Sequence, residues 1–371
     1  MYLDSAFPKS RRTIVFFASP ANAERNVAGL PAVARALREV ARTGVDTCVV
    51  STGSDWTPSS RVTSEIERLA GDMTIIFAGP EAGAIGRANA ISGELLCARR
   101  SFKDQQLDAS AADDRSVGYS AETMLRLAER RVMSGTQKAA DGIVSKAINR
   151  RISRPISGFL LRFDWIRPIH ATVLTALIAI AMTAALLLGG PAGLVIGALL
   201  FQAASIVDGV DGEMARATFR CSDFGAAADS MVDAFTNIAF VGGVVANLWM
   251  AGLSDEAAIG AVGLAAMAVG LALLGMKAHA SQGKFTFDFV KNEFGQRPSR
   301  LKTWLTWLTM RDFYALVGCI LVATGHAAFG LAIFAVVAVG WLVVVCTVLA
   351  LHSAPNSASS PSPTADRSFV R

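Results

Sequence analysis

The apolar and polar positions divide the chain into two parts with different patterns. Residues 1–165 mix short apolar runs with amphipathic stretches, whereas residues 169–352 contain long uncharged runs of Ala, Leu, Val, Ile and Gly. A helix needs about 20 apolar residues to cross the hydrocarbon core of a bilayer. The pattern therefore predicts a soluble domain followed by a set of membrane-spanning helices.

The apolar runs of the second part predict six spans, at 169–189, 191–212, 224–252, 255–276, 313–331 and 332–352. The last two come from one run that is too long for a single span, and its turn is expected between Gly325 and Gly330. Lys and Arg concentrate in residues 277–311 and are absent from residues 189–193. Because cytoplasmic loops carry an excess of these residues, we expect both termini and the 208–223 turn in the cytoplasm, with the protein in the inner membrane.

The first part alternates between strand-like and helix-like segments, which predicts a small α/β domain. Strands are expected at 13–18, 45–52 and 73–79, and helices at 26–44, 59–70 and 120–133. Residues 141–163 then combine an apolar stripe with Arg150, Arg151 and Arg154. A basic amphipathic segment just before a span predicts an interfacial helix whose apolar face enters the headgroup region. The alternative is a linker helix that belongs to the soluble domain.

Composition narrows the class of protein further. The chain is 52% hydrophobic, which together with the apolar runs excludes an ordinary soluble protein. Its net charge of +5 fits an anionic membrane surface. The sequence has no basic stripe interleaved with aromatic residues, so nucleic-acid binding is not expected. The five cysteines are scattered without metal-ligand spacing, so neither a disulfide framework nor a zinc site is expected. The first residues lack the pattern of a cleavable signal peptide.

A charged stretch, residues 208–233, interrupts the apolar part. Asp208 and Asp211 stand at spacing i, i+3, and Asp229 and Asp233 stand at spacing i, i+4. On a helix each pair faces one way, and a short turn between antiparallel spans brings the two pairs together. We therefore expect four carboxylates to converge just inside the cytoplasmic boundary of the membrane.

The free-energy cost of placing these acids in a membrane indicates that they have a functional role. One carboxylate at mid-span costs about 2.5–3.5 kcal/mol on insertion scales, so four cost on the order of 10 kcal/mol. Divalent cations held by oxygen ligands relieve that cost, and paired metals are an established arrangement for displacement at phosphorus. The alternative is a solvated loop with scattered acids, which explains Glu213 and Asp223 but not the four spaced aspartates.

Small residues and one cation accompany the acids. Gly212, Ala215 and Gly225 fall on the acidic faces and leave room for a ligand to approach the backbone. Arg216 follows them, and a guanidinium there can pair with phosphate oxygens in a forked geometry. The combination predicts a substrate that carries a metal-bound diphosphate.

The stretch fills every fixed position of Asp-x2-Asp-Gly-x2-Ala-Arg-x8-Gly-x3-Asp-x3-Asp, so it resembles the signature of the CDP-alcohol phosphotransferases. The resemblance implies a homodimer and six spans with a cytoplasmic active site. It implies that Asp208, Asp211 and Asp229 are the principal ligands of two Mg²⁺ or Mn²⁺ ions. Asp233 would be the general base and touch metal as well. The residues that would receive the CDP moiety are Gly212, Ala215, Arg216 and Gly225.

The implied reaction moves a phosphoalcohol or phosphatidyl group from a CDP-alcohol to an alcohol acceptor, with release of CMP. The donor is CDP-diacylglycerol or a CDP-polyol such as CDP-inositol, and the acceptor class includes polyol phosphates. Lys277 and Arg311 are candidates for contacting an acceptor phosphate, although both also fit a positive-inside flank. The alternatives are an intramembrane prenyltransferase, which would release pyrophosphate, and a catalytically silent membrane scaffold.

A second resemblance covers more of the chain. Residues 140–162 and "DGVDGEMAR" look like the bifunctional enzymes that join an inositol-phosphate cytidylyltransferase to a di-myo-inositol-phosphate-phosphate synthase. Where such enzymes have a Gly-x-Gly-x-Arg loop, this chain has "SPANAERN", and the lysine expected before "VAGLPA" is missing. We therefore expect a degenerate nucleotidyltransferase-like domain at 1–135, an interfacial helix and linker at 136–165, a six-span domain at 166–353 and a disordered tail at 354–371.

Overall fold

The computed structural model describes residues 12–78, 90–98, 120–138, 141–282 and 311–353. The chain forms two compact units. The first unit comprises 1–177, 203–229 and 305–314, and it therefore contains the predicted soluble domain together with the adjoining ends of the first helices of the apolar part. The second unit comprises 178–202, 230–304 and 315–371.

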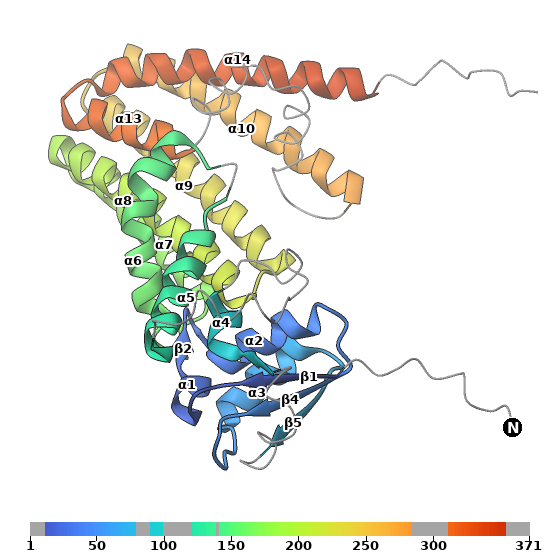
Figure 1. Cartoon of the computed structure of the whole chain (residues 1–371). Coiled ribbons are helices and arrows are strands. Elements are labelled where there is room, and N and C mark those ends of the chain that lie inside the picture. The colour runs from blue at the N-terminus through green and yellow to red at the C-terminus, as the bar shows by residue number, and fades with distance from the viewer. Residues whose placement is uncertain (1–11, 79–89, 99–119, 139–140, 283–310, 354–371) are drawn as a thin grey trace, which may run out of the picture. The chain divides into compact units, whose positions relative to one another are not determined.

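The first unit begins with a parallel four-stranded sheet in the order β5-β4-β1-β6. Figure 1 shows its strands and helices in colours from blue to blue-green, and the predicted α/β domain is confirmed. The strands are β1 (Arg12–Phe16), β4 (Thr47–Ser51), β5 (Thr74–Ala78) and β6 (Ala90–Ser92). The helices are α1 (Pro20–Glu24), α2 (Ala32–Ala41), α3 (Ser60–Ala70), α4 (Gly93–Ala98) and α5 (Ala121–Gly135).

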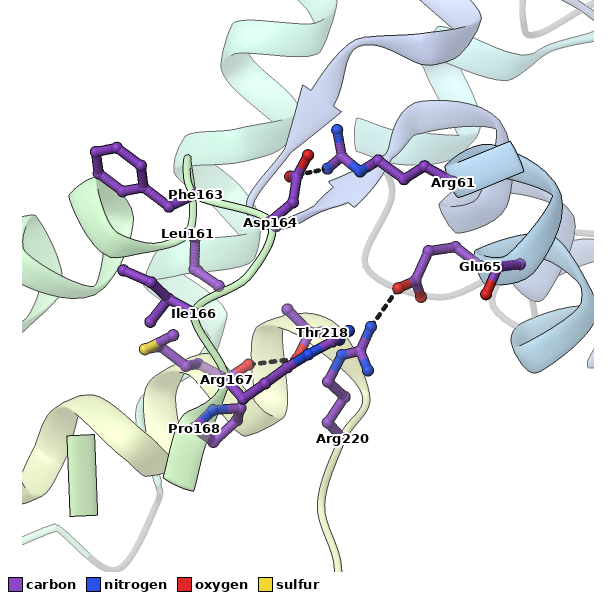
Figure 2. A pocket seen from close by; sticks show the side chains of 13 residues that line it. Arg61, Glu65, Leu161, Phe163, Asp164, Ile166, Arg167, Pro168, Thr218 and Arg220 are labelled. Atoms are coloured by element: carbon purple, nitrogen blue, oxygen red, sulfur yellow. Dashed lines mark hydrogen bonds and ion pairs between the residues drawn. The ribbon is translucent and has the colours of Figure 1, made fainter. Parts of the chain in front are cut away.

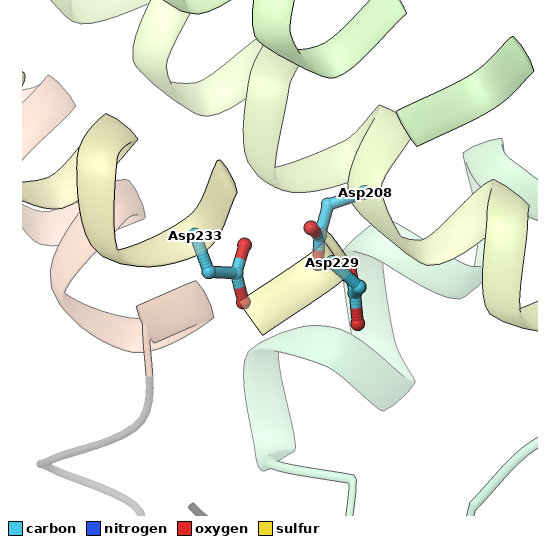
Figure 3. A group of neighbouring side chains, drawn as sticks. All are labelled: Asp208, Asp229 and Asp233. Atoms are coloured by element: carbon cyan, nitrogen blue, oxygen red, sulfur yellow. The ribbon is translucent and has the colours of Figure 1, made fainter. Parts of the chain in front are cut away.

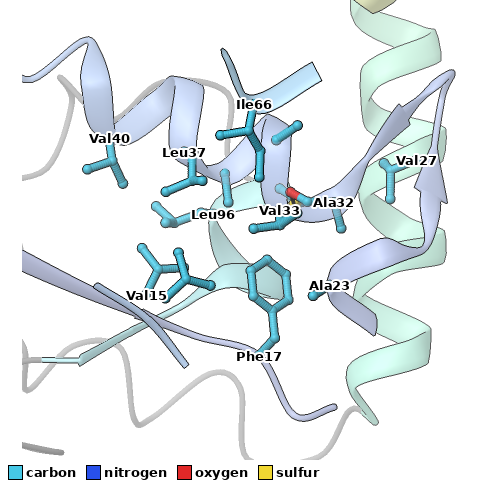
Figure 4. Packing of buried hydrophobic residues seen from close by; sticks show 14 of the residues in the cluster. Val15, Phe17, Ala23, Val27, Ala32, Val33, Leu37, Val40, Ile66 and Leu96 are labelled. Atoms are coloured by element: carbon cyan, nitrogen blue, oxygen red, sulfur yellow. Dashed lines mark hydrogen bonds between the residues drawn. The ribbon is translucent and has the colours of Figure 1, made fainter. Parts of the chain in front are cut away.

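The core of this domain lies between β1 and the helix α2. Val15 and Phe17 pack with Val33 and Leu37 of α2 in one cluster of fully buried side chains (Figure 4). The sequence pattern extended this helix back to residue 26, which is wrong. Residues 26–31 form the hairpin of β2 (Asn26–Val27) and β3 (Leu30–Pro31), because Gly29 adopts a left-handed φ of 87° that turns the chain.

Long apolar helices make up most of the rest. Among the described residues, five are long and apolar enough to cross a membrane. They lie within α7 (Pro168–Leu188), α8 (Gly190–Thr218), α9 (Asp223–Met250), α10 (Ser254–Gln282) and α14 (Ala327–Ser353). The fifth expected span, 313–331, corresponds to α13 (Arg311–Ala323), whose 13 residues are too few to span by length alone.

Two predicted boundaries move. The turn between α13 and α14 falls at 324–326, around Gly325 with φ 84°, so it lies at the start of the expected 325–330 window and the split at 331/332 was too late. The second predicted span ended at 212, but α8 continues to Thr218. The loop that joins the two acidic helices is therefore only 219–222.

The predicted interfacial segment is helical and amphipathic. It consists of a π-helical turn, η4 (Ser145–Asn149), and α6 (Arg150–Leu160). Its apolar side chains, Ile148, Ile152 and Phe159, are exposed, as a lipid-facing stripe would be. Contact of this stripe with headgroups stays a prediction. Arg150 departs from the expected pattern, since it is buried rather than directed to the surface.

In the second unit, α10 and α14 pack closely through small residues. A Cβ built on Gly263 would lie 2.7 Å from the backbone Cα of Ala335, and one on Gly260 would lie 2.6 Å from Leu331. Helices that associate within lipid rely on such close backbone approach, because burial away from water does not drive their contact there. The glycines are therefore part of the interface between these two helices.

Candidate active site

The acidic stretch folds as the end of one long helix and the start of the next. Asp208 and Asp211 lie on α8, and Asp229 and Asp233 lie on α9. The hydroxyl of Ser222 accepts a hydrogen bond from the Gly225 amide at 3.0 Å, which satisfies one of the free donors at the start of α9. This cap begins α9 only a few residues after α8 ends.

Three of the four aspartates meet. Asp208, Asp229 and Asp233 each offer a carboxylate oxygen, and these oxygens all lie within 4.8 Å of one another (Figure 3). Asp229 and Asp233 are one turn apart on the same helix, and Asp208 faces them from α8. All three are half-buried. The predicted convergence is confirmed for these residues.

Asp211 is held differently from the other three. It is buried, and the hydroxyl of Thr172 on α7 donates to its Oδ2 at 2.5 Å. Among the described residues it does not belong to the group whose oxygens lie within 4.8 Å. The hydrogen bond fixes the Asp211 carboxylate against α7, and the role of Asp211 as a ligand beside the other three aspartates stays a prediction.

The donor set fits hard divalent cations. It consists of carboxylate oxygens from two helices, without a cysteine or histidine in the group. Oxygen ligands of this kind suit Mg²⁺ and Mn²⁺, whereas Zn²⁺ sites usually include nitrogen or sulfur. Three carboxylates brought together at half-burial also repel one another, and a bound cation would remove that cost.

Arg216 occupies the space above Gly212. The Arg216 Nη1 lies 2.8 Å from where a Cβ of Gly212 would stand, and its Nε donates to the Thr136 carbonyl at 2.6 Å. The sequence interpretation reserved this space for a ligand. In the structure, the glycine instead lets the guanidinium lie along its own helix. Ala215 and Gly225, the other two small residues of the motif, are half-buried.

Glu213 is the buried residue of the motif helix whose partners the sequence interpretation missed. It is fully buried, and Arg150 Nη1 donates to its Oε1 at 2.8 Å. Ser153 and Ser157 on α6 donate to its two oxygens at 2.7 and 2.6 Å. The reading of Glu213 as a solvated loop acid is therefore wrong. The network attaches α6 to the motif helix, on the turn that follows Asp208.

Arg150 links this network to the rest of the first unit. It pairs with Asp141 at 3.0 Å and donates to the carbonyl of Gly209 at 3.1 Å. Burial lowers the pKa of Arg150, but the hydrogen bonds and charges of Asp141 and Glu213 outweigh burial and hold that pKa above its usual range. Arg150 is therefore a permanent cation between two acids.

The comparisons with known proteins identify this region. Residues 165–349 match the family model described as CDP-alcohol phosphatidyltransferase. These residues form a CDP-alcohol phosphatidyltransferase domain. All eight fixed positions of the motif fall inside it.

Curated relatives of this CDP-alcohol phosphatidyltransferase domain carry the name "Bifunctional IPC transferase and DIPP synthase". One from Aquifex aeolicus is 36% identical over 117 residues, which is 32% of this chain and 26% of the relative. One from Thermococcus kodakarensis is 36% identical over 116 residues (31% and 25%), and one from Rubrobacter xylanophilus is 40% identical over 120 residues (32% and 27%). The matched region thus spans about a quarter of the length of each relative.

The α/β domain contacts the end of the motif helix in the CDP-alcohol phosphatidyltransferase domain. The buried Arg35 of α2 donates to the Ala217 carbonyl at 2.8 Å, and Arg68 of α3 donates to the carbonyls of Thr218 and Phe219 at 2.9 and 3.2 Å. The last carbonyls of a helix have no partner within it. Two arginines from the α/β domain therefore cap α8, and burial lowers the pKa of Arg35 to about 10.

The two candidates for an acceptor phosphate stay predictions. Lys277 lies on α10 and is half-buried. Arg311 begins α13, but its side chain lies outside the described residues. Its neighbour Asp312 accepts a hydrogen bond from the Ser145 amide at 2.7 Å, which connects the start of α13 to η4.

Proposed function

We propose that the protein transfers a phosphoalcohol or phosphatidyl group from a CDP-alcohol to the hydroxyl of an acceptor, with release of CMP. The observation that carries this proposal is the group of three carboxylates, with oxygens within 4.8 Å, inside the complete eight-position motif. The match to the CDP-alcohol phosphatidyltransferase family supports the same reaction class.

Two divalent cations are part of the proposal. Asp208, Asp211 and Asp229 would hold them, with Asp233 contributing, and the oxygen-only donor set supports Mg²⁺ or Mn²⁺. When bound, the cations would neutralise the diphosphate and make its β-phosphorus more electrophilic. Thr172 orients Asp211 by donating to one of its oxygens.

The chain's own residues then have distinct tasks. Asp233 accepts the proton of the acceptor hydroxyl, the acceptor oxygen forms a bond to the β-phosphorus, and the bond from that phosphorus to CMP breaks. CMP leaves with the electron pair. Gly212, Ala215 and Gly225 receive the CDP moiety, and Arg216 supplies a forked cation for its phosphate oxygens. For that role the guanidinium turns from Gly212 toward the ligand.

The substrates are proposed as classes. The donor is CDP-diacylglycerol or a CDP-polyol such as CDP-inositol, and the acceptor is an alcohol, with polyol phosphates included. The names of the relatives, IPC transferase and DIPP synthase, favour testing inositol compounds first. Lys277 and Arg311 are the candidates for contacting a phosphate on the acceptor.

We propose that the α/β domain does not transfer nucleotides. At the end of β1, where a nucleotidyltransferase would present a glycine-rich loop, Ser19 caps the helix α1. The buried carboxylate of Glu94 accepts from the Ala18 amide at 2.9 Å and from Asn22. A carboxylate on these donors leaves them unable to bind a phosphate, and it repels one.

The test is CMP release by the purified full chain with Mn²⁺ or Mg²⁺, each candidate donor and a panel of polyols and polyol phosphates. We expect CMP for at least one pair, its loss in Asp229→Asn, and its retention in Asp223→Asn. Asp223 is the matched control because it is an exposed acid on the same helix that does not occupy a fixed position of the motif. Release of pyrophosphate from a prenyl donor would instead support the prenyltransferase. A phenotype that Asp233→Asn leaves unchanged would support the scaffold.

A further inference from the structure

A small pocket lies where the chain enters the first membrane helix. Its walls are α3, the linker 161–168 and the end of α8, all within the first unit (Figure 2). Its volume is about 250 Å³. The polar side chains that carry the argument are Arg61, Glu65, Asp164, Arg167 and Arg220. None of the motif aspartates lines it.

The charges of this pocket do not balance. Arg61 pairs with Asp164, and Arg220 pairs with Glu65, as Figure 2 shows. Glu65 is shared, because Arg68 also pairs with it at 2.7 Å. Arg167 is exposed and has no ion-pair partner among the described residues. Three arginines thus line the pocket against two acids.

The excess positive charge of the pocket affects the pKa of Arg220. Burial lowers the pKa of Arg220, and the positive charges of Arg68 and Arg167 lower it further, against the opposing effect of Glu65. A guanidinium that is pushed toward its neutral form by neighbouring cations gains from an added anion. Phosphate is a good match, since arginines bind its oxygens with two parallel hydrogen bonds.

Position and size restrict the ligand. Arg167 directly precedes Pro168, the first residue of α7, and two residues before it Trp165 is 71% exposed. Exposed tryptophans and cations next to a span are typical of the headgroup level of a bilayer. A volume of about 250 Å³ is below the range of about 300–1,000 Å³ for drug-sized ligands. The pocket therefore suits a phosphate with a small substituent rather than a nucleotide.

We propose that this pocket binds a phosphate group that bridges the α/β domain and the start of the first membrane helix. The phosphate is presented by the headgroup of an anionic phospholipid or by a small soluble phosphate. Arg167 is its principal partner, with Arg61 and Arg220 at its sides. This proposal does not depend on the proposed catalysis.

The experiment uses the full chain in a neutral detergent and two sets of ligands. One set adds phosphatidylglycerol or phosphatidylcholine and counts bound lipid by native mass spectrometry. The other adds inorganic phosphate, or chloride at equal ionic strength, and measures heat by titration calorimetry. Binding of phosphatidylglycerol over phosphatidylcholine assigns the site to a lipid headgroup, and binding of phosphate over chloride assigns it to a soluble ligand.

Two variants decide whether the binding belongs to this pocket. Arg167→Gln should weaken it by about tenfold or more, because a charge-assisted hydrogen bond is lost. Arg162→Gln should leave it unchanged, since Arg162 is an exposed cation on the same linker that does not line the pocket. Arg167 has no ion-pair partner among the described residues, so its replacement should not unfold the protein. The proposal is overturned if neither ligand set binds, or if the two variants bind alike.

Discussion

Glu213 provides the sharpest test of how the motif helix is held. In the variant Glu213→Ala, Arg150 loses one of its two acids, and the hydroxyls of Ser153 and Ser157 lose their acceptor. The side chains of Glu213 and Arg150 are 0% and 8% exposed, so solvent cannot replace these bonds. Removal of one partner from such a buried pair costs about 3–5 kcal/mol.

Two further variants separate charge from packing. Glu213→Gln keeps one oxygen for Ser153 and Arg150 and places an NH2 group beside Ser157, whose hydroxyl can accept from it, so the cost should be only about 1–2 kcal/mol. The double variant combines Glu213→Ala with Arg150→Met, so that the buried cation is removed together with the buried acid. Its cost should be below the sum of the two single variants, by roughly 0.5–3 kcal/mol. A non-additive result of this sign would show that the two residues stabilise one another.

The measurement is thermal unfolding of the purified full chain in detergent, followed by tryptophan fluorescence. For a chain of this size, the loss in Glu213→Ala corresponds to a midpoint lower by on the order of 10 °C. Asp223→Ala serves as the control, because Asp223 is an exposed acid of the same segment. If Glu213→Ala lay within about 0.5 kcal/mol of the parent, as ordinary surface substitutions do, the network would not be a determinant of stability.

Three shorter predictions concern metal, packing and sidedness. Chelation of divalent cations should abolish CMP release, excess Mn²⁺ or Mg²⁺ should restore it, and neither should restore Asp229→Asn, as a CMP-release assay would show. Gly263→Leu should destabilise the α10–α14 pair by a few kcal/mol. Gly340→Ala should not, because a Cβ on Gly340 meets nothing within 4 Å. The midpoints of thermal unfolding of the two variants test this difference. A maleimide at pH 8 should label the exposed Cys221 from the cytoplasmic face only. It should leave Cys97 unlabelled, since burial raises the pKa of that thiol to about 12. Labelling of Cys221 from the other face of the membrane would contradict the predicted topology.

The sequence was most informative where a pattern repeats or a motif is complete. Long apolar runs predicted the spans. The spacing of Asp208, Asp229 and Asp233 predicted their convergence, because helical geometry places Asp229 and Asp233 on one face and a short turn between antiparallel helices brings Asp208 opposite them. The sequence predicted the ends of helices and strands less accurately. The helix predicted from residue 26 begins at Ala32, since local hairpin geometry at 26–31 overrode the apolar periodicity.

Partners across the fold were harder to predict. Nothing in the sequence places Thr172 beside Asp211, because that contact depends on how α7 and α8 pack. The Glu213 network did leave a signal, since Arg150, Ser153 and Ser157 recur at spacings of three and four and so share one face of α6. The apolar stripe on the opposite face was more conspicuous, and Glu213 was assigned to the solvent instead.

The two arginines that reach α8 from the α/β domain have a consequence for how this protein can change over evolutionary time. A domain without a catalytic task, as proposed for the α/β domain, would normally be free to decay or to be deleted. Here Arg35 and Arg68 contact the carbonyls at the end of the motif helix, so loss of the module would expose that terminus to the solvent. Selection should therefore conserve the surface around these arginines while the strand ends of the sheet drift, and the α/β domain would persist as a structural support.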